Sequence, residues 1–182
     1  MKTSRSIALV VCLALLIAAL LAGCGGNKAP AAQTPDKPPA TSASSIKIIE
    51  PCSLVSKTEA EQYIGQPLKD AEKKETPVVG LKLCVYSTVA EGSGKLLQIG
   101  LTQQSFMSGS NQTPKSIYDS LKNNFPNALK VEGVGDDAFI SPPGLHVLKG
   151  SYYLTVAVGN SNDPKNQELL KTIGKKAVDK LL

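Results

Sequence analysis

The feature that most constrains this chain is an apolar run at residues 7–23, which contains no polar side chain. Lys2 and Arg5 lie before it, and small residues close it directly before Cys24. A basic start, an apolar centre and a small-residue end are typical of a secretory signal segment, which is removed from the mature protein. We therefore expect residues 1–23 to act as an export signal, so that only the polar remainder folds in water.

The residues that end this run, Leu21-Ala22-Gly23-Cys24, resemble the lipobox of bacterial lipoproteins. The resemblance implies cleavage before Cys24 and a diacylglyceryl group on its thiol, and two or three acyl chains hold a protein durably at a membrane. The alternative is an uncleaved membrane-spanning helix. At ~1.5 Å per residue the run spans only about 25 Å, short of the hydrocarbon core, and no basic flank follows it. We expect an extracytoplasmic protein anchored at the cell surface, or at the periplasmic face of the outer membrane in a Gram-negative host.

The segment after the anchor is rich in proline, alanine, serine and threonine and has no bulky apolar residue up to residue 45. Such a composition is typical of a linker, because it offers no surface that a core could bury. We expect residues 24–45 to be the lipidated Cys24 followed by a disordered tether that spans on the order of 25 Å. Residues 46–182 are long enough for a single globular domain with its own core.

The cysteines favour an oxidising compartment. Cys12 leaves with the signal segment and Cys24 is modified by lipid, so Cys52 and Cys84 are the pair that remains. We expect them to form a disulfide, whose loop closure removes roughly 3.7 kcal/mol of unfolded-state freedom. The alternative is a redox or metal pair, but the two cysteines form no CxxC motif and the chain has a single histidine to complete a zinc site.

Three helices are predicted from their end signals. A capping box at residues 56–59 and Gly65 predict a helix over residues 57–64. Thr113 as the N-cap and Pro114 as the first helical residue, with apolar residues at every fourth position, predict a second helix over residues 114–124. An N-cap aspartate before a proline opens a third helix at residue 163, with one apolar stripe opposite its lysines.

Six segments are predicted to be strands because they are β-prone or alternate in polarity. They are residues 82–89, 95–103, 129–132, 137–141, 145–149 and 152–159. Tight turns join several of them, and strands joined in this way are antiparallel. We therefore predict an α+β fold with the order α-β-β-α-β-β-β-β-α, in which an antiparallel sheet carries about three helices on one face.

The arrangement of several short motifs resembles a group of small lipoproteins of unknown function that are best represented in actinobacteria. The motifs are Pro51-Cys52 before a short capped helix, Cys84 before Val85-Tyr86, the segment GVGDDAF at residues 133–139, and a hairpin at residues 145–158. The resemblance covers most of residues 51–182. The chain departs from the group in lacking the tryptophan that is often found soon after the second cysteine. It implies a two-cysteine, surface-tethered domain of mixed α and β structure, and it implies no activity.

Two segments invite a ligand hypothesis and are explained more simply by turns. Gly133 and Gly135 suggest a dinucleotide loop, but the third glycine is missing and a strand, not a helix, follows. The carboxylates of Glu132, Asp136 and Asp137 offer oxygen ligands for Ca²⁺, but their spacing matches no EF-hand and aspartate is common in turns. We predict neither a metal site nor a cofactor site here.

His146 is the only histidine, so any histidine-based acid–base chemistry would depend on it. It alternates with Leu145 and Val147 in a predicted strand, so we expect it to be a polar side chain that points outward, away from the core. The chain also lacks a GxSxG motif for a serine hydrolase. We therefore predict no catalytic residue.

The charge of the mature chain is mildly basic. Without Lys2 and Arg5, 18 basic and 15 acidic residues remain. Part of the excess lies in the last helix, at Lys171, Lys175, Lys176 and Lys180. We expect these lysines to form a solvated face near the negative end of the helix dipole, with contact to anionic headgroups as the alternative. An extracytoplasmic location disfavours nucleic acid as a partner.

The expected function is that of a lipid-anchored envelope lipoprotein whose domain binds an envelope protein or a small ligand without catalysis. The alternative is a carrier of a lipid or small hydrophobic molecule, and an envelope enzyme is the least favoured. A carrier would have a cavity of several hundred cubic ångströms lined by Leu, Ile and Val. An enzyme would place His146 or an acidic pair in a cleft with a shifted pKa.

Overall fold

The computed structural model describes residues 47–90, 92, 94–109 and 111–181. These residues belong to one compact unit, Ser44–Leu182. The predicted export signal, the predicted lipidation of Cys24 and the predicted tether up to residue 45 all fall on residues outside the described ones. Within the described part of the chain, no helix is both long enough and apolar enough to cross a membrane.

The described unit contains four α-helices, two short 3-10 turns and seven strands. The helices are α1 (Pro51–Leu54), α2 (Lys57–Ile64), α3 (Pro114–Asn124) and α4 (Pro164–Asp179), and the 3-10 turns are η1 (Pro77–Val79) and η2 (Gln104–Phe106). The strands are β1 (Glu72–Thr76), β2 (Leu81–Ser87), β3 (Leu96–Gln103), β4 (Leu129–Val131), β5 (Asp137–Ser141), β6 (Gly144–Lys149) and β7 (Tyr152–Val158).

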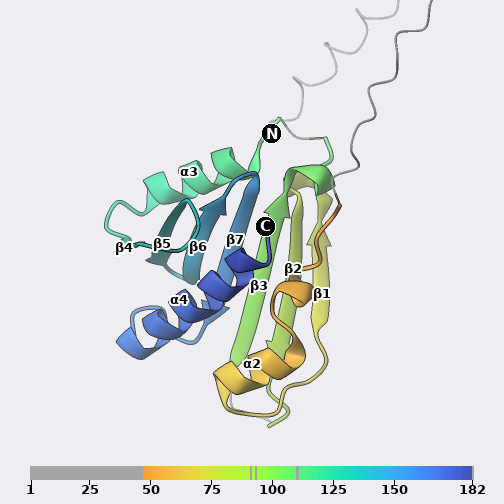
Figure 1. Ribbon diagram of the computed structural model, residues 1–182, viewed down its shortest axis with the longest axis vertical. Helices are drawn as coiled ribbons and strands as arrows, with labels where there is room; N and C mark the ends of the chain where they lie inside the picture. Colours follow the sequence, from red (N-terminus) through yellow and green to blue (C-terminus); the bar gives the residue numbers. More distant parts are fainter. Residues whose placement is uncertain (1–46, 91, 93, 110, 182) are drawn as a thin grey trace, which may run out of the picture. The chain divides into compact units, whose positions relative to one another are not determined.

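The seven strands form one sheet in the order β1-β2-β3-β7-β6-β5-β4, and every neighbouring pair is antiparallel (Figure 1). The first three strands and the last four are each a meander, and α3 connects them. The two meanders meet where β3 pairs with β7, with Leu101 opposite Leu154. The predicted α+β class and the antiparallel sheet are confirmed.

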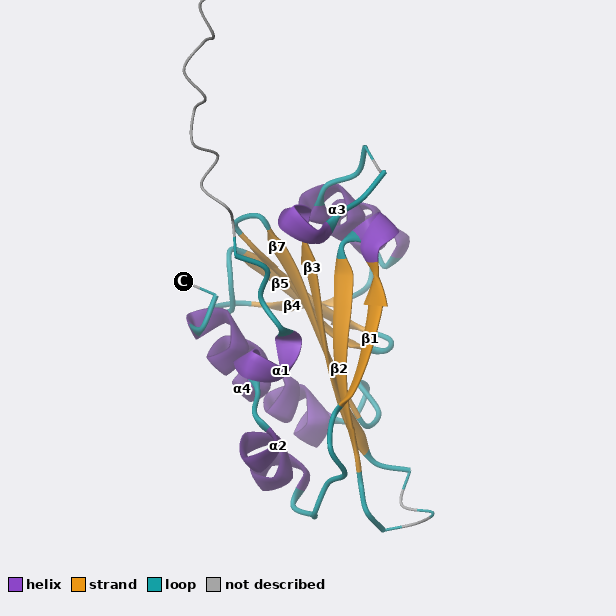
Figure 2. Cartoon of the chain, turned by 90° about the vertical axis from the view of Figure 1, so that its right-hand side faces the viewer, coloured by secondary structure: helices purple, strands orange, loops and turns teal. Residues whose placement is uncertain are grey.

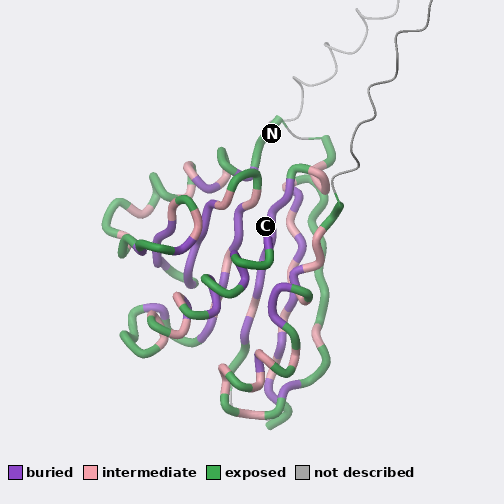
Figure 3. Tube along the Cα trace, viewed as in Figure 1, coloured by how far each residue is buried: buried purple, intermediate pink, exposed green. Residues whose placement is uncertain are grey.

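One face of this sheet carries the main core. Every second residue of β3, namely Leu97, Ile99 and Leu101, points into this core. The alternate residues of β6 and β7 on the same face join them. Helices α1, α2 and α4 cover this face (Figure 2), and Leu170 and Ile173 of α4 are fully buried against it. Burial is accordingly concentrated along the central strands, whereas β1 is exposed throughout (Figure 3).

The helix predicted over residues 114–124 is present as α3, but it lies on the opposite face of the sheet from the other three. Tyr118 of α3 packs against Phe139, Leu148 and Tyr153, which point away from the main core. Their neighbours along the strands, such as Ala138 and Leu154, belong to the main core instead. Because β5, β6 and β7 are apolar on both faces, the second face also needs a cover, and the prediction of all helices on one face was wrong.

Two elements were absent from the prediction. Strand β1 has the sequence EKKET, which has no apolar residue and no buried position, so it has no pattern that identifies a strand. It exists because its backbone pairs with the edge of β2, from Glu72 opposite Val85 to Thr76 opposite Leu81. A charged strand at this position also protects the sheet edge from other chains. Helix α1 is a single turn that begins at Pro51.

Candidate functional site

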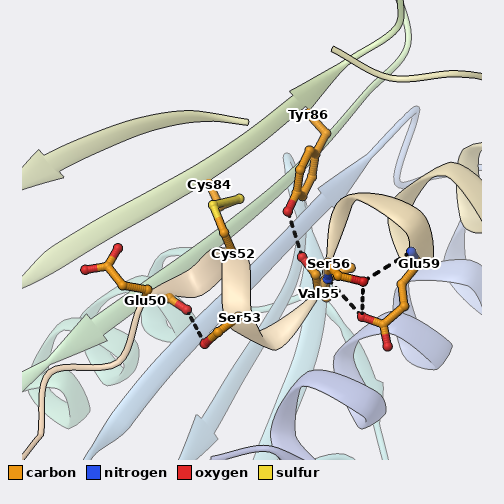
Figure 4. Close-up of a disulfide and its surroundings, with 8 residues drawn as sticks. All are labelled: Glu50, Cys52, Ser53, Val55, Ser56, Glu59, Cys84 and Tyr86. Atoms are coloured by element: carbon orange, nitrogen blue, oxygen red, sulfur yellow. Dashed lines mark hydrogen bonds between the residues drawn. A yellow bond between two sulfur atoms is a disulfide. The ribbon is translucent and has the colours of Figure 1, made fainter. Parts of the chain in front are cut away.

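The predicted disulfide between Cys52 and Cys84 is present and joins α1 to β2 (Figure 4). The two Cα atoms are 5.3 Å apart, within the usual range for a disulfide, and Cys84 is fully buried. The two cysteines are separated by 32 residues in the sequence, and the bond between them fixes α1 to the sheet. Its burial in the main core gives it a structural role.

Two further contacts hold the same helices in place. Tyr86 follows Cys84 by two residues in β2. Its hydroxyl donates a hydrogen bond of 2.9 Å to the carbonyl oxygen of Val55, in the link between α1 and α2 (Figure 4). Helix α2 begins with the predicted capping box, in which Ser56 and Glu59 bond reciprocally to each other's backbone amides. The start of the domain is therefore held to the sheet by a disulfide and by a hydrogen bond.

The first described residues are held to the sheet by Gln103, which is fully buried at the end of β3. Its side-chain Oε1 accepts a hydrogen bond of 2.8 Å from the amide of Ile49, and its Nε2 donates one of 2.6 Å to the carbonyl of the same residue. An amide side chain thus satisfies the backbone of the segment that leads from the predicted tether into the domain.

A groove lies on the second face of the sheet, between α3 and strands β2, β3, β7 and β6. Its volume is about 510 Å³. Its apolar lining includes Leu81, Leu83, Ile117, Leu121, Pro143 and Ala157. Most of these side chains are only half-buried, because α3 covers the β6 and β7 part of this face and leaves β2 and β3 open. Among the lining residues none is Asp, Glu, Lys or Arg.

The most deeply buried polar residue in the groove wall is His146, which is 3% exposed. Its Nδ1 lies 2.8 Å from the hydroxyl oxygen of Tyr153, and its ring stacks on Phe139 with centroids 4.8 Å apart. Its Nε2 is buried and has no hydrogen-bond partner among the described residues. Burial lowers the pKa of His146 to about 4, so the imidazole is neutral at pH 7.

The expected outward orientation of His146 is correct only in part. Its side chain does point to the opposite face from Leu145 and Val147, as alternation requires. That face, however, is covered by α3, so His146 is buried rather than exposed. The sequence of one strand cannot reveal a helix that packs on its second face, which is why the expectation of an exposed histidine was wrong.

The predicted turn at residues 133–135 leads into β5, and Gly133 and Gly135 have φ values of 75° and 66°, which favour glycine. The nearby carboxylates are each paired with a lysine: Glu132 with Lys130, Asp136 with Lys149, and Asp137 with Lys122. Within the described ranges no group of three or more His, Cys, Asp or Glu side chains is placed to hold a metal ion.

The lysines of α4 mostly form ion pairs. Lys176 and Lys180 lie 3.0 and 3.2 Å from the carboxylate of Glu59 in α2, and Lys171 pairs with Glu168. The hydrogen bond from the Ser56 amide, together with these two lysines, lowers the pKa of Glu59 to about 2. This part of the lysine face therefore links α4 to α2.

A scan against protein-family models gave no match, and searches of curated proteins and of solved structures found no similar chain. The resemblance to small actinobacterial lipoproteins therefore stays a prediction from the motifs. The functional residues are inferred from the geometry of the domain alone.

Proposed function

We propose that this protein is a lipid-anchored, extracytoplasmic binding module that holds a small apolar molecule in the groove between α3 and the sheet. Of the two binding roles expected from the sequence, this is the carrier role. The observation that supports it is the groove of about 510 Å³ lined by leucine and isoleucine. Ligand sites of this kind have volumes of a few hundred cubic ångströms, mostly apolar walls and a few polar groups.

The position of the groove also supports this role. Leu81 and Leu83 of β2 face it and remain half-buried, although the opposite face of the same strand is fully covered. Apolar side chains that are gathered in one hollow and left open to water are typical of a surface that contacts another molecule. Ile117 and Leu121 of α3 face the same space from the other side.

The proposed location rests on the sequence and agrees with the disulfide. The apolar run, the residues before Cys24 and the polar segment up to residue 45 support export, lipid attachment and a tether. A buried disulfide between Cys52 and Cys84 suits an oxidising compartment outside the cytoplasm. The membrane, contacted through the diacylglyceryl group on Cys24, is then the permanent partner, and nucleic acid is not a partner.

We assign no reaction to the groove. Its ionisable side chains are His146 and Tyr153, which contact each other. A general base works best with a pKa near the working pH, whereas burial lowers the pKa of His146 to about 4 and raises that of Tyr153. Both groups are therefore neutral at pH 7 and suited to hydrogen bonding rather than to proton transfer.

Photolabelling tests whether the groove binds apolar molecules. The full chain in lipid nanodiscs is irradiated with benzophenone, an uncharged probe, and labelled peptides are mapped by mass spectrometry. We expect saturable labelling of the α3 segment that contains Ile117 and Leu121, and of the first half of β2. Labelling spread evenly over the exposed surface, or none in these segments, would contradict the proposal.

A matched pair of variants distinguishes binding in the groove from non-specific binding to the protein surface. Ala157→Phe adds a ring inside the groove, whereas Ser151→Phe adds the same ring at an exposed turn between β6 and β7. We expect Ala157→Phe to reduce groove labelling at least tenfold and Ser151→Phe to leave it unchanged. Equal labelling in both variants would show that the probe does not occupy the groove.

The anchor is tested by Cys24→Ser in cells. We expect the variant to remain an unprocessed precursor or to be released from the membrane, because serine has no thiol to accept the diacylglyceryl group. Cys12→Ser, within the apolar run, is the matched control and should be processed and attached normally. Membrane attachment and processing that persist in Cys24→Ser would disprove lipid attachment at this residue.

A further inference from the structure

The proposed function leaves open the chemistry of the ligand, and one buried, unpaired polar atom in the groove wall restricts it. Resting on that function, we infer that the ligand is an uncharged molecule with an acceptor oxygen, such as a ketone or ester carbonyl, that receives a hydrogen bond from Nε2–H of His146. Three features of the groove select such a ligand: the tautomer of the buried imidazole, the lack of charge among the described lining residues, and the unpaired state of Nε2.

The tautomer follows from the partner of the other ring nitrogen. Nδ1 of His146 and the hydroxyl of Tyr153 are 2.8 Å apart, and one of them must donate. If Nδ1 carried the proton, the buried tyrosine hydroxyl would have no acceptor for its own proton among the described residues. If Tyr153 donates to Nδ1, its proton is bonded and the imidazole proton resides on Nε2. The second arrangement leaves fewer polar groups unpaired, so we assign it.

Nε2–H is then a buried donor without a partner. Leaving a buried donor unpaired destabilises the domain, and a ligand oxygen that accepts the hydrogen bond recovers this free energy. A ligand with only donors at this point would not recover it. The atom is buried in the groove wall, so wall side chains must shift to let an oxygen reach it, and side-chain rearrangement of this kind is common on binding.

The charge of the ligand follows from the lining. Among the groove residues that the structure describes, none bears a charge at pH 7, and His146 is neutral. Moving a charged group from water into such an environment is costly when no opposite charge accompanies it. The groove therefore favours a neutral carbonyl over a carboxylate. The hydroxyl of Thr155, which is opposite His146 in the register of β6 and β7, is a second neutral group at this point.

The test compares two rigid molecules that differ in one oxygen. Fluorenone and fluorene share the same three-ring frame, and fluorenone alone carries a carbonyl. Each is used to compete with benzophenone for photolabelling of the groove peptides in the full chain in nanodiscs, at matched membrane concentrations. We expect fluorenone to compete about tenfold more strongly, because one hydrogen bond to a buried donor of ~1.4 kcal/mol corresponds to a factor of ten.

The control is His146→Phe, which keeps an aromatic ring beside Phe139 and removes the donor. In this variant we expect fluorenone and fluorene to compete equally, while both still displace benzophenone. Equal competition by the two molecules in the unmodified chain would overturn the inference and leave groove binding intact. Failure of both to compete, or an absence of groove labelling, would instead overturn the proposed function.

Discussion

Nδ1 of His146 and the hydroxyl of Tyr153 lie 2.8 Å apart in the wall of the groove, beneath α3. Both residues are almost fully buried, at 3% and 6% exposure. They come from neighbouring strands, β6 and β7, and the pair is the polar centre of an otherwise aromatic cluster with Tyr118 and Phe139. The stability of this face and the chemistry of the groove therefore depend on the same hydrogen bond.

Removal of both members of this pair should cost less than the sum of the two single removals. Tyr153→Phe leaves Nδ1 without its donor, and His146→Phe leaves the tyrosine hydroxyl without its acceptor. We expect each single variant to lose about 1–3 kcal/mol of unfolding free energy. The double variant should lose less than the sum of the two by about 1 kcal/mol. Urea titrations of the four proteins give this coupling, and strict additivity would show that the two side chains do not interact.

The domain should become less stable as the pH falls from 7 to 5. His146 takes up a proton near pH 6.5 in the unfolded chain and near pH 4 in the folded one. Its contribution is fully present above about pH 6.5 and is lost as the pH falls toward 4. The expected loss between pH 7 and 5 is about 2 kcal/mol, measured by urea titration at each pH.

His146→Phe is the control for this pH dependence, since it removes the only histidine of the chain. We expect its unfolding free energy to change little between pH 7 and 5. Glu59, whose pKa is lowered to about 2, loses its contribution only below its ordinary value of 4.5, outside this range. An undiminished pH dependence in the variant would assign the effect to other groups.

Loss of the disulfide should destabilise the domain strongly. The double variant Cys52→Ala, Cys84→Ala releases a loop with a sequence separation of 32 residues. We expect a loss of about 3–4 kcal/mol in unfolding free energy, chiefly because the unfolded chain gains freedom. Thermal unfolding of the variant beside the unmodified chain measures the difference. Unchanged stability would mean that the bond contributes nothing to this fold.

Gln103→Leu should release the start of the domain without unfolding it. The side chain of Gln103 makes both hydrogen bonds to the backbone of Ile49, and leucine can make neither. We expect faster amide hydrogen exchange at residues 49–50 and a loss of about 1–3 kcal/mol in stability. Gln104→Leu, at the exposed neighbouring position, is the matched control and should leave exchange at Ile49 unchanged.

The elements that could be predicted from sequence are those whose signals are local. The capping box before α2, and the threonine and proline before α3, set helix starts that agree with the structure to the residue. The short β-prone segment predicted at residues 137–141 likewise agrees with the observed bounds of β5. The disulfide followed from counting the cysteines, without any knowledge of the fold.

What could not be predicted depends on contacts between segments far apart in sequence. Strand β1 has no apolar pattern and is formed only by pairing with β2. The placement of α3 depends on the second apolar face of the sheet, to which Phe139 and Tyr153 contribute one residue each from separate strands. The groove arises from that placement. A partial signal was present in Ile117 and Leu121, whose four-residue spacing gives α3 an apolar face.

The most direct test of groove binding is a methyl NMR titration of the full chain in nanodiscs with benzophenone. Binding in the groove predicts saturable shifts for the methyl groups of Leu83, Ile117 and Leu121, which line it. It also predicts constant shifts for Ile99 and Ile173 in the core on the other face of the sheet. Groove methyl groups that do not respond at saturating benzophenone, or that shift no more than those of Ile99 and Ile173, would contradict the proposed function.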